Sequence, residues 1–273
     1  MEDIRQTKSW KKYLQSSGWI VEEVGSINVF IKKIPLSPFS MMKIQRYSGE
    51  LNLGDLKKLK RKYRVVYVVA EPIDKKVHGW KVNKHPFLPS KTIVIDLRKD
   101  EKKLWKDLST NAKRILKKDS LVQTIELRGK KDRRKFYKNW KKAAHTWLMS
   151  EERFNKLIEA FGEDASLWVS KKGDSLLSGI ILLKSGDTVN YFQTWTSEAG
   201  RRSGSHYHLV WQVILECKRQ SVRWFDFEGI LDERWPQKRW AGFSEFKKRF
   251  GGKVISYPGS FVKWFYGNKK ALS

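Results

Sequence analysis

The spacing of apolar residues in the first third of the chain predicts a small mixed region of strands and one helix. Alternating apolar and polar residues predict half-buried strands, a continuous β-branched run predicts a buried strand, and leucines three residues apart among lysines predict a helix. The predicted elements are strands over 25–34, 41–47 and 64–70 and a helix over 53–62. Prolines and glycines interrupt the pattern between residues 72 and 89, where we expect a domain boundary.

The remaining two thirds of the chain contain longer elements in a different order. Gly-Asp pairs at 173–174 and 186–187 predict two hairpin turns between three strands. The predicted elements are a strand over 92–97, helices over 100–118, 132–149 and 151–161, strands over 167–170, 176–184 and 188–195, a helix over 204–219, a strand over 222–227, a helix over 244–250 and a strand over 254–257.

This order of elements resembles the GNAT acyltransferase fold, in which an antiparallel meander leads into a helix and then into parallel strands. The first part of the chain is similar to a reduced copy of the same arrangement. We therefore expect an α+β protein with two GNAT-like lobes, a reduced lobe over 1–91 and a larger one over 92–273. A cleft between or beside the lobes is the expected place for a site.

The charge of the chain narrows the class of partner. Lys and Arg number 57 against 29 Asp and Glu, so the net charge is +28, which favours polyanionic partners such as RNA or an anionic membrane surface. Residues 98–140 hold 16 Lys or Arg against 6 Asp or Glu, an excess of +10. We expect this region to bind the RNA backbone without sequence preference, and a solvated helix face is the equally simple alternative. The proposed contacts are Lys113, Arg114, Lys117 and Lys118.

The cysteine content and the N-terminus indicate the compartment. Cys217 is the only cysteine, so the chain forms no internal disulfide, and a reducing compartment with a packed thiol is the simplest interpretation. No apolar stretch follows the polar N-terminus, and no run approaches the length of a membrane span. We expect a cytoplasmic protein, at most in peripheral contact with the anionic inner membrane surface, and we expect no metal site.

A C-terminal block of residues carries a family resemblance. The segment 226–230 (DFEGI) and the segment 242–252 (GFSEFKKRFGG) closely resemble the D-F-x-G-I and G-x-x-x-F-K-x-x-F-G patterns of the Fem peptidyltransferases. Weaker matches are Gln15-Ser16 with Trp19, and Glu71-Pro72. Two positions depart from the family, because Glu23 stands where a basic residue is expected and 149–154 (MSEERF) lacks an expected arginine.

The resemblance implies a function. Fem enzymes have two GNAT-like domains, use no CoA, and transfer an amino acid from aminoacyl-tRNA to an amine of the peptidoglycan stem peptide, on a nucleotide-linked or lipid-linked precursor. Larger members carry a helical arm that binds tRNA. No long heptad segment is present here, so the chain resembles a short member without a coiled-coil arm and without a cofactor.

The chemistry of this reaction selects the candidate residues. Aminolysis of an ester needs a positioned amine, a route for its proton and stabilisation of the developing oxyanion. Lys247 in the family motif is the candidate cation, and Asp226 and Glu228 are the candidate acids beside the amine. Tyr191 and Gln193, on one strand face with Trp195, are candidates for substrate contact or for the core. The remaining proposed substrate contacts are Lys43, Arg46, Glu71 and Phe246, and His206 and His208 are weaker candidates for a base.

One further motif keeps an alternative open. The segment 201–205 (RRSGS) at the start of a helix resembles the R-x-x-G-x-G/A loop by which GNAT enzymes bind the CoA pyrophosphate, although His206 occupies its last position. The alternative function is therefore a CoA-dependent N-acyltransferase with acyl-CoA as donor. A second alternative, which rests on charge alone, is a non-catalytic nucleic-acid-binding protein.

Overall fold

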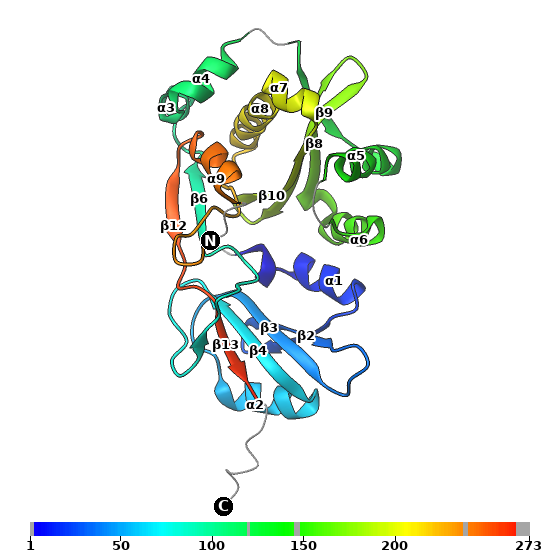
Figure 1. Ribbon diagram of the computed structural model, residues 1–273, viewed down its shortest axis with the longest axis vertical. Coiled ribbons are helices and arrows are strands. Elements are labelled where there is room, and N and C mark those ends of the chain that lie inside the picture. Colours follow the sequence, from blue (N-terminus) through cyan, green and yellow to red (C-terminus); the bar gives the residue numbers. More distant parts are fainter. Residues whose placement is uncertain (1–2, 119–120, 145–147, 237–239, 266–273) are drawn as a thin grey trace, which may run out of the picture. The chain divides into compact units, whose positions relative to one another are not determined.

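The computed structural model describes residues 3–118, 121–144, 148–236 and 240–265, which form two compact units (Figure 1). Unit 1 contains 1–4, 91–231 and 237–255, and unit 2 contains 5–90, 232–236 and 256–273. Each unit is built on its own sheet. The chain therefore enters unit 1 near residue 91 and returns to unit 2 at its C-terminal end.

Unit 1 is organised around a seven-stranded sheet in the order β12-β6-β11-β10-β9-β8-β7. Its strands are β6 (Lys91–Asp96), β7 (Gln123–Leu127), β8 (Ala165–Lys172), β9 (Ser175–Ser185), β10 (Thr188–Thr196), β11 (Trp224–Asp226) and β12 (Lys253–Ser256). Its helices are α3 (Glu101–Asp107), α4 (Thr110–Leu116), α5 (Gly129–Ala143), α6 (Glu151–Phe161), α7 (Glu198–Ser203), α8 (Ser205–Arg219) and α9 (Ala241–Lys248), with a 3-10 turn at Gly162–Asp164.

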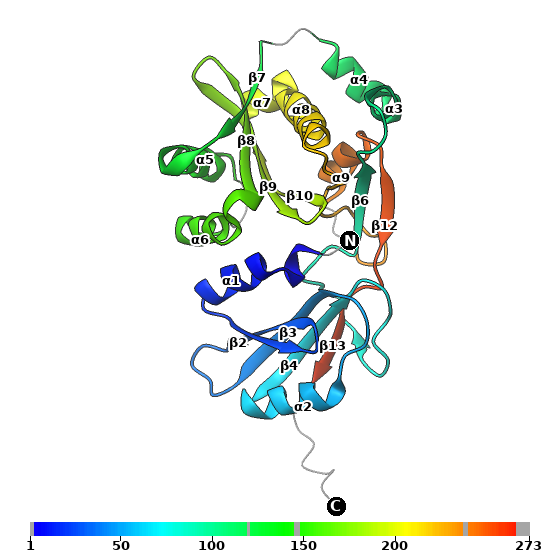
Figure 2. The same ribbon diagram turned by 180° about the vertical axis from the view of Figure 1, so that it is seen from behind.

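Helices cover both faces of this sheet (Figures 1 and 2). On one face, α8 packs its apolar side, including Leu209 and Val213, on β9, β10 and β11. On the other face lie α5 and α6, whose aromatic residues Phe136 and Phe154 stack with ring centroids 6.0 Å apart. Burial of these apolar surfaces is the main stabilisation of the unit.

Unit 2 contains a six-stranded sheet in the order β1-β2-β3-β4-β13-β5. Its elements are a 3-10 turn (Ile4–Gln6), α1 (Lys8–Ser16), β1 (Ile20–Val24), β2 (Ile27–Lys33), β3 (Ser40–Tyr47), α2 (Leu53–Lys62), β4 (Val65–Pro72), β5 (Lys81–Val82) and β13 (Phe261–Trp264). The core includes Val29, Ile31 and Ile44. Because β13 pairs with β4 and β5, residues 256–265 complete this unit, whereas the sequence placed them in the larger lobe.

Several predicted elements differ from the structure. The helix expected over 100–118 is two helices, because Leu108 is extended and Ser109 caps α4 by accepting a hydrogen bond from Ala112 N at 3.2 Å. The helix expected over 132–149 ends at Ala143, and residues 145–147 lie outside the described residues. The helix α1 and the strands β1, β5, β7 and β13 were missed. In the sheet of unit 1, β6 lies between β11 and β12.

The short pairing of β10 with β11 creates space for a site in unit 1. These strands pair in parallel only from Thr188 to Asn190. Beyond this point β10 continues to Thr196 along β9, while β11 ends at Asp226. The second half of β10 therefore borders an opening rather than another strand in the described part of the sheet.

Candidate active site

Lys247 lies inside unit 1, although its sequence neighbours are basic. Its side chain is on the inner face of α9, and the residue is only 8% exposed. The ammonium donates hydrogen bonds to the carbonyl oxygens of Phe227 at 2.7 Å and Gly229 at 2.6 Å. One turn earlier, Ser244 Oγ accepts a hydrogen bond from Leu231 N at 2.7 Å. Ser244 and Lys247 thus attach α9 to the segment that follows β11.

The segment after β11 is folded so that both candidate carboxylates lie close to this cation. Glu228 adopts a left-handed conformation with φ of 68°, and the two carbonyls that hold Lys247 flank it. Asp226 is buried, and its Oδ1 accepts hydrogen bonds from the Thr92 hydroxyl and from Glu228 N. The structure therefore brings together the three residues predicted to carry the chemistry.

Burial changes the protonation of this cluster. Desolvation and, next, the negative charge of Glu228 together raise the pKa of Asp226 to about 6, against the hydrogen bond from Thr92. Desolvation lowers the pKa of Lys247 to about 8, although Glu228 and Asp226 favour its charged form. Near pH 7 the Lys247 ammonium and the Asp226 carboxylate are therefore both charged. The carboxylate becomes protonated below about pH 6, and the ammonium becomes neutral above about pH 8.

A cavity of about 610 Å³ opens beside Lys247, at the free edge of β10. The rings of Tyr191 and Phe243 line it, and their centroids lie 5.5 and 5.1 Å from Lys247 Nζ. Phe246 and Gln193 line the same cavity. Three of the predicted substrate contacts, Tyr191, Gln193 and Phe246, are thus found on one cavity next to the predicted cation.

A β-bulge explains why this cavity reaches residues from both faces of the sheet. The pairing of β10 with β9 shifts between Tyr191–Leu182 and Gln193–Ile181, and such an extra residue reverses the alternation of side chains. Tyr191 consequently packs against Phe225 and Phe227 on the α8 side, whereas Trp195 packs against Phe136 of α5. The expectation that Tyr191, Gln193 and Trp195 share one face is therefore wrong.

Tyr191 is held by a buried polar group. Its hydroxyl lies 2.5 Å from His206 Nε2, and the Thr194 hydroxyl lies 3.0 Å from the same nitrogen. Desolvation lowers the pKa of His206 to about 3, so the imidazole is neutral at physiological pH. His206 therefore acts as a hydrogen-bonding partner that fixes the cavity wall, and its low pKa makes it a poor proton acceptor.

The other three proposed substrate contacts belong to unit 2, and each has partners there. The Glu71 carboxylate accepts hydrogen bonds from Phe87 N at 2.8 Å, Leu88 N at 3.0 Å and Gln45 Nε2 at 3.1 Å. This arrangement anchors the loop after β4 and favours a structural role. Arg46 is buried, donates to the Pro89 carbonyl, and lies over the Tyr257 ring at 3.7 Å.

Lys43 differs from these two residues, because its ammonium lies over the indole ring of Trp19 at 4.3 Å. Lys32 approaches the same ring at 5.8 Å. Trp19 is partly exposed. The Lys43–Trp19 pair is therefore the part of unit 2 in which predicted residues remain accessible to a ligand.

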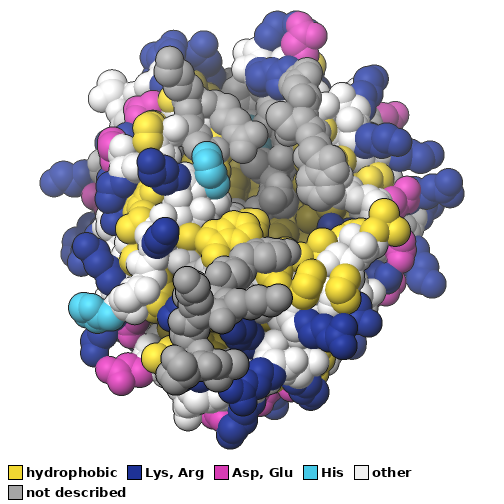
Figure 3. Space-filling view, turned by 60° about the horizontal axis from the view of Figure 1, so that its bottom comes forward, with side chains coloured by type: hydrophobic (Ala, Val, Ile, Leu, Met, Phe, Trp, Pro, Cys, Tyr) yellow, Lys and Arg dark blue, Asp and Glu magenta, His cyan; other side chains and the backbone are white. Residues whose placement is uncertain are grey.

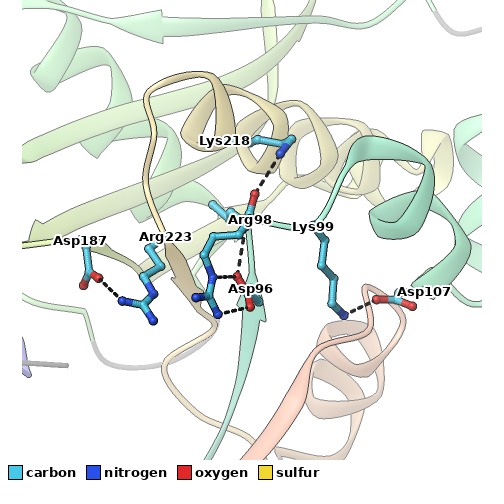
Figure 4. Close-up of polar contacts among 8 residues, drawn as sticks. Asp96, Arg98, Lys99, Asp107, Asp187, Lys218 and Arg223 are labelled. Atoms are coloured by element: carbon cyan, nitrogen blue, oxygen red, sulfur yellow. Dashed lines mark hydrogen bonds and ion pairs between the residues drawn. The ribbon is translucent and has the colours of Figure 1, made fainter.

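The basic region is partly neutralised by its own acids. Figure 4 shows Arg98 paired with Asp96, Lys99 with Asp107 and Arg223 with Asp187, at 2.6, 2.6 and 3.9 Å. Lys218 in the same view donates to the Leu97 carbonyl oxygen at 3.0 Å. These pairs reduce the positive charge available near 98–107.

The predicted tRNA contacts lie on and just after α4. Lys113 donates to the Lys106 carbonyl oxygen at 2.8 Å, and Arg114 donates to Asn111 Oδ1 at 2.9 Å. Lys117 and Lys118 are exposed. A different face of the molecule, shown in Figure 3, also presents more Lys and Arg than Asp and Glu side chains. The structure thus leaves Lys117 and Lys118 as the most accessible members of the predicted set.

The loop that resembles a CoA-binding motif is folded into the short helix α7. Gly204 N donates to the Arg201 carbonyl at 3.3 Å, and Tyr207 N donates to the Gly204 carbonyl at 2.9 Å. The Arg201 guanidinium donates to the Thr196 carbonyl at 2.9 Å. Two backbone amides of this region, those of Gly204 and Tyr207, are therefore used within the turn.

Some residues of the site were not predicted from the sequence. Ser244, Thr194 and Phe243 contribute to it, as do Trp140 and Tyr207 on the cavity wall. The signal for Ser244 is its position three residues before Lys247, which puts both on one helix face. No helix in the described residues is long and apolar enough to cross a membrane.

Comparisons with known proteins add a family similarity and the fold. Residues 169–268, which include Lys247 and both carboxylates, match the model of the FemAB family. The structure of FemX superimposes with a TM-score of 0.78 at 16% identity, covering 96% of this chain and 92% of FemX. The structure of L-PGS from Bacillus licheniformis superimposes with a TM-score of 0.59 at 10% identity, covering 92% of this chain and 85% of L-PGS.

A GCN5-related N-acetyltransferase from Kribbella flavida superimposes with a TM-score of 0.52 at 10% identity. The match covers 97% of this chain and 96% of the acetyltransferase. No curated protein sequence matches the chain. The predicted α+β fold with two GNAT-like lobes is confirmed. The predicted resemblance to the Fem family is confirmed by the family match over residues 169–268, and with it the prediction of an acyltransferase enzyme.

Proposed function

We propose that this protein transfers an aminoacyl group from aminoacyl-tRNA to an amine of a peptidoglycan precursor peptide. The observation that carries the proposal is the buried Lys247 ammonium, held beside Asp226 and Glu228 within the segment that matches the FemAB model. A fixed cation in a desolvated site is suited to a reaction in which negative charge develops on a carbonyl oxygen.

In the proposed reaction the neutral acceptor amine attacks the ester carbonyl carbon, and a C–N bond forms. The carbonyl oxygen becomes an oxyanion, which the Lys247 ammonium stabilises. The C–O bond to the terminal ribose then breaks, so the amine loses one proton and the ribose hydroxyl gains one. Asp226 is the proposed proton acceptor, because its Oδ2 accepts no hydrogen bond from the described residues and its carboxylate is ionised above about pH 6.

The charge of the chain and the state of the α7 turn support a tRNA donor over acyl-CoA. The net charge of +28 favours a polyanion. The amides of Gly204 and Tyr207 are hydrogen bonded within the chain, so a CoA pyrophosphate could use these two amides only by displacing those bonds. The acceptor is less closely defined, because Glu23, which stands where the family has a basic residue, pairs with Lys11.

A transfer assay with the full chain tests the proposal. Charged tRNAs and acyl-CoAs are supplied in parallel, each with nucleotide-linked and lipid-linked muropeptides as acceptors, and the new amide is detected by mass spectrometry. We expect product only from charged tRNA. Product from acyl-CoA alone would establish the alternative donor. Binding of tRNA without any transfer, under conditions in which Lys247→Met and wild type behave identically, would leave only a nucleic-acid-binding role.

A further inference from the structure

The cavity beside Lys247 has an unusual chemical character for a site in so basic a protein. Its wall consists mainly of aromatic and small apolar side chains. Among the described lining residues, Arg201 alone carries a charge, and its guanidinium is engaged with the Thr196 carbonyl at 2.9 Å. No described carboxylate lines the cavity. A cationic side chain would therefore find no counter-ion among the described lining residues, whereas an apolar side chain would pack favourably against the wall.

The walls of this cavity are supported from behind. Trp195 packs on Phe136 at 5.9 Å between ring centroids, and Trp140 packs on Phe154 at 6.1 Å. On the opposite side, Phe246 packs on Tyr207 at 4.8 Å. Since these rings are held in place by other rings, the cavity is formed before a ligand binds, and it does not need to be opened by one.

The position of the cavity links it to the reacting group. The rings of Tyr191 and Phe243 line the cavity, and their centroids lie 5.5 and 5.1 Å from Lys247 Nζ. An ester carbonyl bound at Lys247 therefore has its amino-acid side chain next to these rings. A glycyl or alanyl group would leave most of about 610 Å³ to water against an apolar wall, which forgoes the gain from apolar burial.

We propose that this cavity binds the side chain of a large apolar or aromatic amino acid, such as leucine or phenylalanine, carried by the donor. The inference rests on the proposed function, because it assigns the donor's aminoacyl group to the cavity. The terminal adenosine of the tRNA is also an aromatic group, and the experiments below separate it from the side chain.

The first experiment compares tRNAs charged with phenylalanine, leucine, alanine, glycine and lysine in the transfer assay. We expect kcat/KM for phenylalanyl or leucyl donors to exceed that for alanyl donors by at least about 10²-fold, since one buried methylene alone is worth about tenfold or more. Equal or higher values for glycyl or alanyl donors would overturn the inference while supporting the proposed function.

A binding measurement gives a result that does not depend on turnover. Stable adenosine 3′-amides of phenylalanine and alanine, and adenosine itself, are titrated into the full chain by calorimetry. We expect the phenylalanine amide to bind at least about tenfold more tightly than the alanine amide. If adenosine alone binds as tightly as both amides, the cavity holds the base and the side-chain inference fails. If the phenylalanine amide is preferred but no tRNA is a donor, the proposed function fails and the cavity assignment stands.

A substitution that fills the cavity provides the matched test. Ala143 is half-buried on its wall, and Ala165 is half-buried at a different cavity of unit 1. Ala143→Phe should lower transfer of phenylalanine and leucine by at least about tenfold relative to alanine, whereas Ala165→Phe should not change this ratio. An equal loss for all donors would contradict the inference. Ala144→Leu, at the next wall position, serves if Ala143→Phe lowers the melting temperature.

Discussion

Two groups of basic residues in unit 1 differ in almost every physical respect. Lys117 and Lys118 are exposed and directly follow the helical residues of α4. Lys247 is buried, bound to two backbone carbonyls, and close enough to two carboxylates for them to influence its protonation. Both groups occur in runs of consecutive basic residues in the sequence.

The difference shows what charge density can and cannot locate. A high density of exposed cations indicates a surface that attracts polyanions, and such a surface needs no unique geometry. A single desolvated cation has a strong and directed field, which suits a developing oxyanion. We therefore assign association to the exposed group and chemistry to Lys247, and four predictions test this assignment in order of expected effect.

The largest effect is expected from Lys247→Met. Loss of one preorganised electrostatic donor should lower kcat by about 10²-fold to 10³-fold, and Lys247→Arg should restore only part of it, because the guanidinium is larger and directed differently. Steady-state kinetics at saturating charged tRNA measure this loss, with thermal melts to establish folding. Lys248→Met is the control, because Lys248 is exposed and pairs with Glu245 at 2.8 Å. Equal, small effects at both positions would refute the assignment.

The second prediction concerns Asp226→Asn. The amide can still accept hydrogen bonds from Thr92 and Glu228 N, so the fold should be kept while the proton acceptor is lost. We expect a fall in kcat of about 10²-fold, the lower end of what a general base contributes. A fall confined to KM would show that Asp226 positions the acceptor and takes no proton.

The same substitution has a distinct effect on stability. The folded state raises the pKa of Asp226 from 3.8 to about 6, so the native protein binds more protons than the unfolded chain in this window. The stabilisation by this group is present below about pH 4 and is lost as the pH rises through 6. Denaturant unfolding should show that the advantage of wild type over Asp226→Asn decreases from pH 4 to pH 6. An advantage that is constant with pH would contradict the buried, titrating carboxyl.

The sequence predicted which residues form the buried cluster better than it predicted their surroundings. The D-F-x-G-I and F-K motifs singled out Lys247, Asp226 and Glu228, which the structure brings together. Composition alone predicted that Lys247 is a surface residue, because Lys248 and Arg249 directly follow it. Its burial depends on the two carbonyls of the segment after β11, and that long-range contact leaves no periodic signal.

The order of most elements in unit 1 also followed from apolar periodicity, since β8, β9, β10 and α8 have clear two-residue or helical spacing. The bulge between Tyr191 and Gln193 did not, because a single inserted residue changes the register without changing composition. The return of β13 to unit 2 was missed for a related reason. A short edge segment such as Phe261–Trp264 is defined by its pairing with β4 rather than by its own pattern.

The third prediction is a bell-shaped dependence of kcat on pH. The charged Lys247 is needed, and its pKa is about 8, so activity should fall above pH 8. The ionised Asp226 is needed, and its pKa is about 6, so activity should fall below pH 6. Each limb should approach a tenfold change per pH unit. If neutral Lys247 were the base instead, kcat would rise through pH 8. That result would make Lys247, and not Asp226, the proton acceptor.

The smallest effect is expected for the exposed group. Lys117→Gln with Lys118→Gln removes two solvent-facing cations after α4, and each lost phosphate contact should reduce the slope of log affinity against log salt by about 0.7 to 0.9. Binding of tRNA should weaken several-fold at low salt, while kcat at saturating tRNA stays unchanged, because association and not chemistry is affected. Lys171→Gln with Lys172→Gln, at the end of β8, is the matched control for generic charge loss. Identical slopes for both double variants would show that tRNA responds to net charge alone, and the contrast between a docking surface and a catalytic cation would then rest on Lys247 only.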